Sequence, residues 1–383
     1  MLEDESATAT KATKEETEAL AQVNERLRRP VRLKARRIAR EMSQRVFSLV
    51  NADWGMEIEA CHRTGVVEVH GSGHLHAHPT VRCSHGRFCP YCAANDAQRR
   101  VKRYLPVVME AAKSYRLQFV TLTTLSLPDG GLEDADRIFW NAWTKLRRRD
   151  VWDAVAGSVM AVETTWSREY GWHLHGHGLV AVSWDENYDY GAIQTAWEEL
   201  TGASIVNFRT IDMSNAEDLE RSIRELLKYP AKLSKSGRPP RQGERLSDVP
   251  QGTRLRLPDG TEHLPSEFAD GEIPREWLLV RDGLLEWPDD AFEEYADWSH
   301  GRRTMRSYGV FYNPPEPVET LADEPMEDPV IATVRWEWQR DTSRRSGETL
   351  LVFLIQGDKS TSETRPTISD RALGPPIALA DTA

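Results

Sequence analysis

Three histidines alternate along one short stretch of this sequence, Trp172–Val182. They are His173, His175 and His177. Successive side chains of a β-strand point to opposite faces, so a strand here would present all three imidazoles on one side. The residues facing the other way are apolar, which predicts a strand lying over a core. Imidazole nitrogens are common metal ligands, and the stretch therefore predicts a metal site on one face of a sheet.

The segment before these histidines, Gly157–Trp166, is a second predicted strand, and Ser167–Gly171 is a plausible hairpin loop. If Trp166 and Trp172 pair across the loop, Glu163 lies directly opposite His175. Paired residues share a face, so one carboxylate would join the imidazoles. Such a ligand set suits Mg²⁺ or Mn²⁺ acting as a Lewis acid on a phosphate. The alternative is that the histidines are metal-free structural residues.

Four cysteines indicate a second kind of metal site. Cys89 and Cys92 form a CxxC pair, and Cys61 and Cys83 precede it. Four thiolates close a tetrahedral structural zinc site. A neighbouring histidine could replace one thiolate, the candidates being His62, His70, His74, His76, His78 and His85. We interpret the cluster His74–His78 as part of this zinc module or as a polar loop, because Pro79 follows it. The alternative is four buried, unliganded cysteines.

A predicted helix capped by Ser214 or Asn215 carries a possible nucleophile near its end. Spacings of four and three residues place Glu225, Tyr229 and Lys232 on one helical face. In such a group the lysine can stabilise a phenolate and the carboxylate can activate water. Pro230 interrupts helical hydrogen bonding, so this face exists only if the helix kinks there. A plain amphipathic helix is the competing interpretation.

Composition narrows the class of protein. The 383 residues carry a net charge of −11, a weak argument against a nucleic-acid partner, but the charge is unevenly distributed. Between Arg26 and Arg45 nine basic residues accompany one acid, Glu41, which indicates either a solvated helix face or a surface for a DNA backbone. No apolar run is long enough to span a membrane and no signal peptide is evident. We expect a cytoplasmic protein in a reducing compartment.

The predicted organisation has four parts. A basic N-terminal region, whose first twenty residues are disordered or a frayed helix, is followed by the zinc module and then by a nuclease domain with a flexible insertion. A linker, a small hairpin of Val330–Trp338 with Thr349–Ile355 and a disordered acidic tail complete the chain. Their bounds are 1–50, 51–105, 106–315 with the insertion at 233–275, and 316–383.

Taken in order, the motifs resemble those of a known family. A strand with Thr-Leu-Thr at Thr121–Thr123 precedes His-x-His at His175–His177, and Tyr-x-x-Lys at Tyr229–Lys232 follows. The sequence in this respect resembles the plasmid rolling-circle replication initiators (Rep) of the HUH endonuclease superfamily, over roughly Cys61–Phe311. The cysteine module and a late Gly-Arg-Arg segment are also similar to the plasmid subgroup. Gly176 departs from the pattern, because the family usually has a bulkier apolar residue there.

The resemblance implies roles for these residues. His175 and His177 match the pair that binds the divalent metal, with His173 as the extra histidine often seen before it. Tyr229 matches the nucleophile, and Glu225 the carboxylate with which some members hydrolyse the final phosphotyrosine. Glu163 as third ligand rests on the hairpin register above. The implied fold is α+β, a central antiparallel sheet flanked by helices with the histidines on a middle strand.

The activity implied is nicking and rejoining of single-stranded or hairpin origin DNA. A 5′-phosphotyrosine intermediate would leave a 3′-OH primer, and a host helicase and the replication machinery would be the partners. No Walker loop is present in the sequence. Two alternatives stay open. One is a rolling-circle transposase with the same chemistry, and the other is a non-catalytic, zinc-containing DNA-binding regulator.

Overall fold

A computed structural model describes residues 13–127, 131–184, 188–203, 206–211, 219, 221, 223, 233, 236–249, 253–314, 330–341 and 348–355. The chain divides into two compact units. The first comprises Met1–His85 with Thr320–Ala383, and the second comprises Gly86–Glu319. Where described, the chain is α+β, with antiparallel sheets and flanking helices, as the sequence predicts.

The first unit contains a four-stranded antiparallel sheet in the order β13-β12-β1-β2, and one helix packs its apolar side against it. Its elements are α1 (Lys14–Leu27), α2 (Pro30–Leu49), α3 (Ala52–Ala60), β1 (Thr64–His70), β2 (Leu75–Pro79), β12 (Val330–Arg340) and β13 (Glu348–Ile355). The predicted C-terminal hairpin is present, but β12 pairs with β1, so it is not a separate addition. A capping box at Thr13 starts α1, so residues 14–20 are an ordered helix whose Ala19 and Leu20 are buried.

The basic run of the sequence lies mainly on α2, where one of its residues is structural. Arg36 is 2% exposed and donates hydrogen bonds to the carboxylate of Glu348, the shortest at 2.8 Å, and to Glu59 at 3.3 Å. A buried charge is tolerated when it is paired and hydrogen-bonded in this way. This arginine therefore ties the helix to β13 and is not free to contact DNA.

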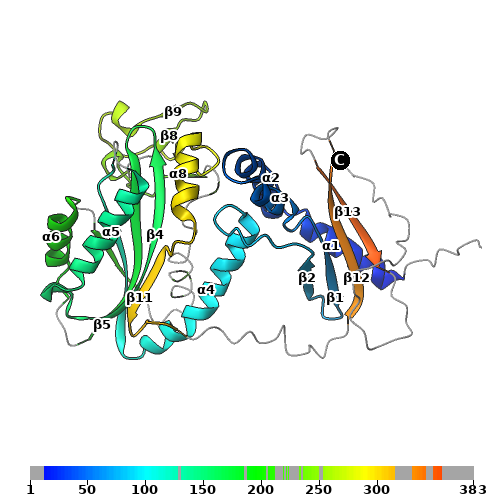
Figure 1. The fold of residues 1–383 in the computed structure, drawn as a ribbon, viewed down its shortest axis with the longest axis horizontal. Coiled ribbons are helices and arrows are strands. Elements are labelled where there is room, and N and C mark those ends of the chain that lie inside the picture. The colour runs from blue at the N-terminus through cyan, green and yellow to red at the C-terminus, as the bar shows by residue number, and fades with distance from the viewer. Residues whose placement is uncertain are drawn as a thin grey trace, which may run out of the picture. The chain divides into compact units, whose positions relative to one another are not determined.

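The second unit is built on a five-stranded antiparallel sheet in the order β11-β4-β5-β3-β6. Helix α5 packs against one face and α4 against the other (Figure 1). The elements are α4 (Pro90–Ala111), β3 (Tyr115–Thr123), α5 (Leu132–Leu146), η1 (Asp150–Trp152), β4 (Val155–Ser167), β5 (Gly171–Ser183), α6 (Tyr190–Thr201), β6 (Val206–Thr210), α8 (Asp289–Ser299) and β11 (Met305–Gly309). The histidine strand, β5, is the central one, as expected.

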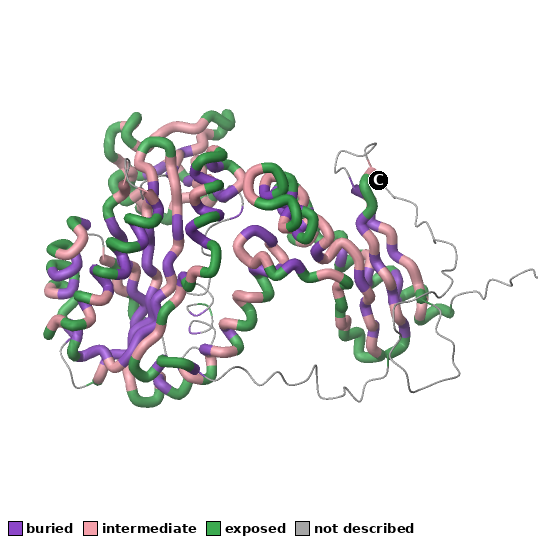
Figure 2. The backbone as a smooth tube through the Cα atoms, in the orientation of Figure 1, coloured by how far each residue is buried: buried purple, intermediate pink, exposed green. Residues whose placement is uncertain are grey.

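The predicted flexible insertion is instead largely folded. Residues within and just after it form a small sheet in the order β7-β10-β8-β9, with its own core around Leu255, Ile273 and Leu279. Its elements are β7 (Ser236–Arg238), η2 (Leu246–Asp248), β8 (Arg254–Arg256), β9 (Glu262–His263), η3 (Pro265–Glu267) and β10 (Leu278–Arg281). Figure 2 shows that burial is concentrated in the long strands of the larger sheet, while this small sheet is mostly exposed or half-buried. The turn-rich composition was misleading because short strands can form between closely spaced Gly and Pro residues.

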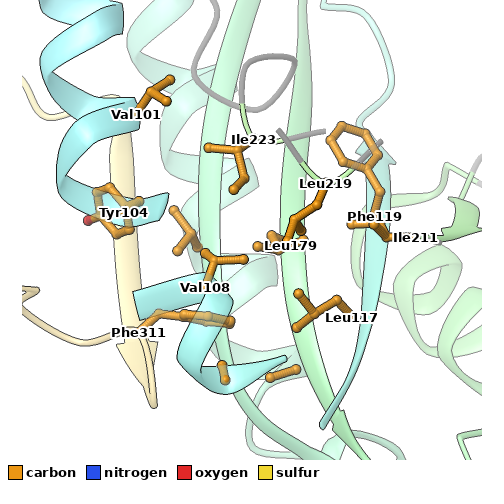
Figure 3. Close-up of a cluster of buried hydrophobic side chains, with 13 residues drawn as sticks. Val101, Tyr104, Val108, Leu117, Phe119, Leu179, Ile211, Leu219, Ile223 and Phe311 are labelled. Carbon is orange, nitrogen blue, oxygen red and sulfur yellow. The ribbon is translucent and has the colours of Figure 1, made fainter. Parts of the chain in front are cut away.

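One apolar core fills the face of the larger sheet that also carries the histidines. Val101, Tyr104 and Val108 of α4 pack against Leu117 of β3 and Leu179 of β5 (Figure 3). Leu219 and Ile223 are helical, 2% and 0% exposed, and belong to the same core. The helix predicted before Tyr229 therefore packs, at these two positions, on the histidine side of the sheet.

Candidate functional site: a histidine–glutamate group on the central strands

The β4–β5 hairpin has the register that the sequence predicts. Trp166 pairs with Trp172, and Glu163 lies directly opposite His175. Gly171, which adopts a φ of +66°, begins β5 after the turn, a conformation that glycine adopts without steric cost. From the other side, β3 places Thr123 opposite His175 and Thr121 opposite His177. The Glu, His and Thr side chains therefore share one face.

The polar atoms on this face are only partly satisfied. His177 Nε2 lies 3.1 Å from Glu163 Oε2, and its Nδ1 lies 3.4 Å from the hydroxyl of Thr121. His173 Nδ1 lies 2.9 Å from Ser126 Oγ. His175 is 7% exposed, and its buried Nε2 has no hydrogen-bond partner among the described residues. A buried, unsatisfied nitrogen is costly, and a bound ligand is one explanation for it.

Burial also sets the protonation of two of these histidines. Desolvation, assisted by neighbouring Arg281, lowers the pKa of His173 to about 4. For His175, desolvation is again the largest cause, and it holds the pKa well below the ordinary value, with nearby His173 and Arg281 acting in the same direction. Both rings are therefore neutral at pH 7, the form in which imidazole coordinates metals.

The donor atoms of this group do not yet converge. Among the described residues there are two sets of three or more possible metal ligands whose ligand atoms lie within 4.8 Å of one another inside the set. Neither set contains these histidines. The ring centroids of His175 and His177 are 6.4 Å apart, and those of His173 and His175 are 4.3 Å apart. A cation shared by Glu163, His175 and His177 would therefore require their side chains to rotate.

The glycine between the two motif histidines has a steric cause. Gly176 points to the opposite face of β5, where Phe139 of α5 fills the space. A Cβ on Gly176 would lie 2.1 Å from Phe139 Cζ and 2.9 Å from Met160 Sδ. In this chain an aromatic side chain on the helix occupies the volume that a larger strand residue would need.

We expect Gly176→Ala to lower the free energy of unfolding by about 1–3 kcal/mol, because the added methyl group overpacks the α5–β5 contact. Urea unfolding followed by circular dichroism measures the change. Gly237→Ala is the matched control, since a Cβ on that strand glycine meets nothing closer than 3.7 Å. Adding Phe139→Leu should recover part of the loss. Equal stability of the Gly176→Ala and native proteins would contradict this packing account.

The four predicted cysteines come together. All are buried, and their sulfur atoms lie within 4.8 Å of one another. Cys61 ends α3, Cys89 caps the start of α4, and Cys92 lies in its first turn. None forms a disulfide. A buried group of four thiols at this spacing is a possible metal site, as the sequence predicts.

The rival histidine cluster is neither a loop nor part of the cysteine group. His76 and His78 lie on β2, and Glu68 on the adjacent strand β1 is 3.3 Å from His78 Nε2 and 3.9 Å from His76 Nδ1. These three side chains are partly exposed. The prediction of a polar loop was wrong because the sequence gives no sign that β1 would pair with this segment.

The predicted nucleophile and its neighbours, Tyr229, Glu225 and Lys232, lie outside the described residues, so their assignment stays a prediction. Sequence reasoning also missed a residue. Arg281, at the end of β10, lines a pocket beside His173 and donates from Nε to Thr253 Oγ1 at 2.8 Å. No sequence signal identifies it, because its position depends on how the insertion folds.

A comparison with protein-family models matches residues 74–311 to the replication protein family, Rep_1. That match covers more than half of the chain. The chain belongs to this family. Membership in the Rep_1 family is consistent with a plasmid replication initiator, so the resemblance stated from motif order is confirmed. Searches of curated proteins and of solved structures each found no match. None of the described helices of this Rep_1 member combines the length and apolarity that a bilayer crossing demands.

Proposed function

We propose that this Rep_1 protein initiates plasmid rolling-circle replication by nicking and rejoining single-stranded or hairpin origin DNA through Tyr229. The observation that carries the proposal is the group Glu163, His175 and His177 on the two central strands, with the buried Nε2 of His175 unsatisfied among the described residues. A carboxylate and neutral imidazoles on one face are a donor set for a divalent cation.

Mg²⁺ or Mn²⁺ fits this donor set. His175 and His177 would supply nitrogen ligands and Glu163 an oxygen, with His173 available as a fourth donor or as a support for its neighbour. A bound cation would supply Lewis-acid polarisation of the scissile phosphate. Thr121, which contacts His177 Nδ1, would help to fix the orientation of that ring.

Tyr229 lies outside the described residues, but one described residue on each side of it has a known contact. Six residues before it, Ile223 is buried in the core on the histidine face. Four residues after it, the carbonyl of Leu233 accepts a hydrogen bond of 3.1 Å from the backbone of Leu285, close in sequence to Arg281. The assignment of Tyr229 as the nucleophile rests on the order of the motifs in the sequence.

The proposed reaction conserves the energy of the cleaved phosphodiester bond in the phosphotyrosine linkage. The Tyr229 oxygen attacks phosphorus, the bond from phosphorus to the 3′ oxygen breaks, and that oxygen takes up a proton to become the 3′-OH primer. Lys232 would stabilise the phenolate, and Glu225 would activate water or the returning hydroxyl. Because the phosphotyrosine stores the phosphoryl group, rejoining needs no ATP, and strand separation is left to a host helicase.

For the cysteine group we propose a structural Zn²⁺ held by Cys61, Cys83, Cys89 and Cys92. Four buried sulfurs within 4.8 Å of one another support this assignment. Their thiolates would be stabilised by the ion. The zinc content of the purified protein, compared with that of a Cys89→Ser variant, measures it.

The test of the function is incubation of the native protein with Mn²⁺ and single-stranded DNA from its own replicon. We expect a protein–DNA adduct that survives denaturing electrophoresis, and primer extension should map one nick. Nicking at transposon ends instead of a plasmid origin would favour the transposase alternative. DNA binding without any adduct would leave the non-catalytic regulator as the better account.

A further inference from the structure

A pocket borders the histidine group, and apart from His173 none of its lining residues has a role in the proposed reaction. It lies at the turn end of the β4–β5 hairpin, and His173 is one of its lining residues. The other lining residues are Ser126, Thr165, Trp166, Ser167, Tyr170, Gly171, Arg281 and Asp282. Hydroxyl groups, two aromatic rings and one guanidinium therefore surround a single hollow.

Among the described residues that line this pocket, Arg281 is the only cationic side chain, and it is incompletely partnered. Its Nε donates to Thr253, whereas its two terminal amino groups form no ion pair with any carboxylate in the described chain. Burial lowers the pKa of the Arg281 guanidinium, and nearby Glu163 acts in the opposite direction. Arginine nevertheless keeps its charge in proteins, so a half-buried positive charge with free donors faces the hollow.

The carboxylate that lines the pocket is already paired with another arginine. Asp282 also lines the pocket but forms an ion pair with Arg254 of β8. The neighbouring cation Arg238 is paired with Glu244. The small sheet thus pairs its other arginines internally and leaves Arg281 turned to the pocket.

We infer that one nucleotide of the single strand next to the cleaved phosphate lies across the surface of this small pocket, with its phosphate on Arg281 and its base outside the hollow against Trp166 or Tyr170. The inference rests on the proposed function for its choice of ligand. A planar guanidinium matches the geometry of phosphate oxygens, and aromatic faces hold unpaired bases without regard to their identity. The contiguity of His173 with His175 places this subsite beside the metal ligands.

A scan with neutral phosphates tests the inference. Single-stranded oligonucleotides that together tile the origin, each with one methylphosphonate, are bound by native protein without added Mg²⁺ or Mn²⁺, so that no strand is cut. Fluorescence anisotropy gives the dissociation constants. We expect a methylphosphonate at one position within three nucleotides of the nick to weaken binding by the native protein about tenfold. The Arg281→Gln variant should bind the unmodified strand more weakly by a similar factor, and a methylphosphonate at that one position should then have no further effect on its binding.

The controls separate charge from folding. Arg245→Gln removes an exposed arginine of the same insertion and should keep the native pattern. Arg281→Lys keeps a charge and should retain sensitivity at the same phosphate with weaker affinity. A native protein indifferent to every single replacement near the nick overturns the inference whatever the variants do, as does an Arg281→Gln variant with the native pattern.

Failure of this subsite and failure of the proposed function give different results. The scan measures binding alone. If the protein shows the phosphate dependence but never forms an adduct, the inference about the pocket stands and the proposed nicking reaction is wrong. If the protein nicks its origin but its DNA binding does not depend on Arg281, the proposed reaction stands and the inference about the pocket is wrong.

Discussion

Replacing Tyr229 with phenylalanine is expected to abolish the covalent adduct with origin DNA, lowering the rate of its formation by at least about a thousandfold. The substitution removes only the attacking oxygen, and loss of a nucleophile commonly costs that much or more. The assay uses Mn²⁺, end-labelled single-stranded origin DNA and denaturing electrophoresis. Binding of the same DNA should be unchanged, since phenylalanine keeps the ring.

Tyr312→Phe is the matched control for this experiment. Tyr312 is 73% exposed and follows β11, so its hydroxyl can be removed without disturbing the core. This variant should form the adduct at the native rate. An equal adduct from Tyr229→Phe and Tyr312→Phe would show that another residue attacks the phosphate.

The features predicted well from the sequence are local. The β4–β5 hairpin follows from alternation of period two and a short polar turn, and those two constraints fix its register to the residue, including Glu163 opposite His175. The cysteine group follows from ligand chemistry, because CxxC spacing brings two sulfurs together at the start of a helix. In both cases the interacting residues are close in the chain or their chemistry admits few partners.

The features missed depend on pairing between distant segments. β1 pairs with β12, which places Val67 opposite Val334. Neither segment's sequence predicts that the other will be its partner. The same holds for the small sheet that carries Arg281. Arg36 likewise looked like part of a basic surface, because the sequence does not reveal that Glu348 would meet it in the interior. A run of basic residues predicts a charged surface only where none of its members is buried against an acidic residue from a distant part of the chain.

His175→Ala is expected to reduce DNA cleavage by at least about a hundredfold while leaving origin binding within about threefold of the native value. The change deletes one proposed nitrogen ligand, and even changes to groups that only orient metal ligands cost ten- to a hundredfold. Binding should persist because phosphate contacts from arginines elsewhere supply most of the affinity. Nicking is measured over a Mn²⁺ titration, and binding by anisotropy at fixed salt.

The Mn²⁺ titration separates lost coordination from lost structure. A variant that is folded but coordinates the ion weakly needs more Mn²⁺ for half-maximal nicking, whereas an unfolded one fails at every concentration and loses binding too. His263→Ala, on partly exposed β9 in the insertion, should match the native protein in both assays. Native cleavage by folded His175→Ala at unchanged Mn²⁺ would remove His175 from the metal site. Its buried Nε2, which has no partner among the described residues, would then need another explanation.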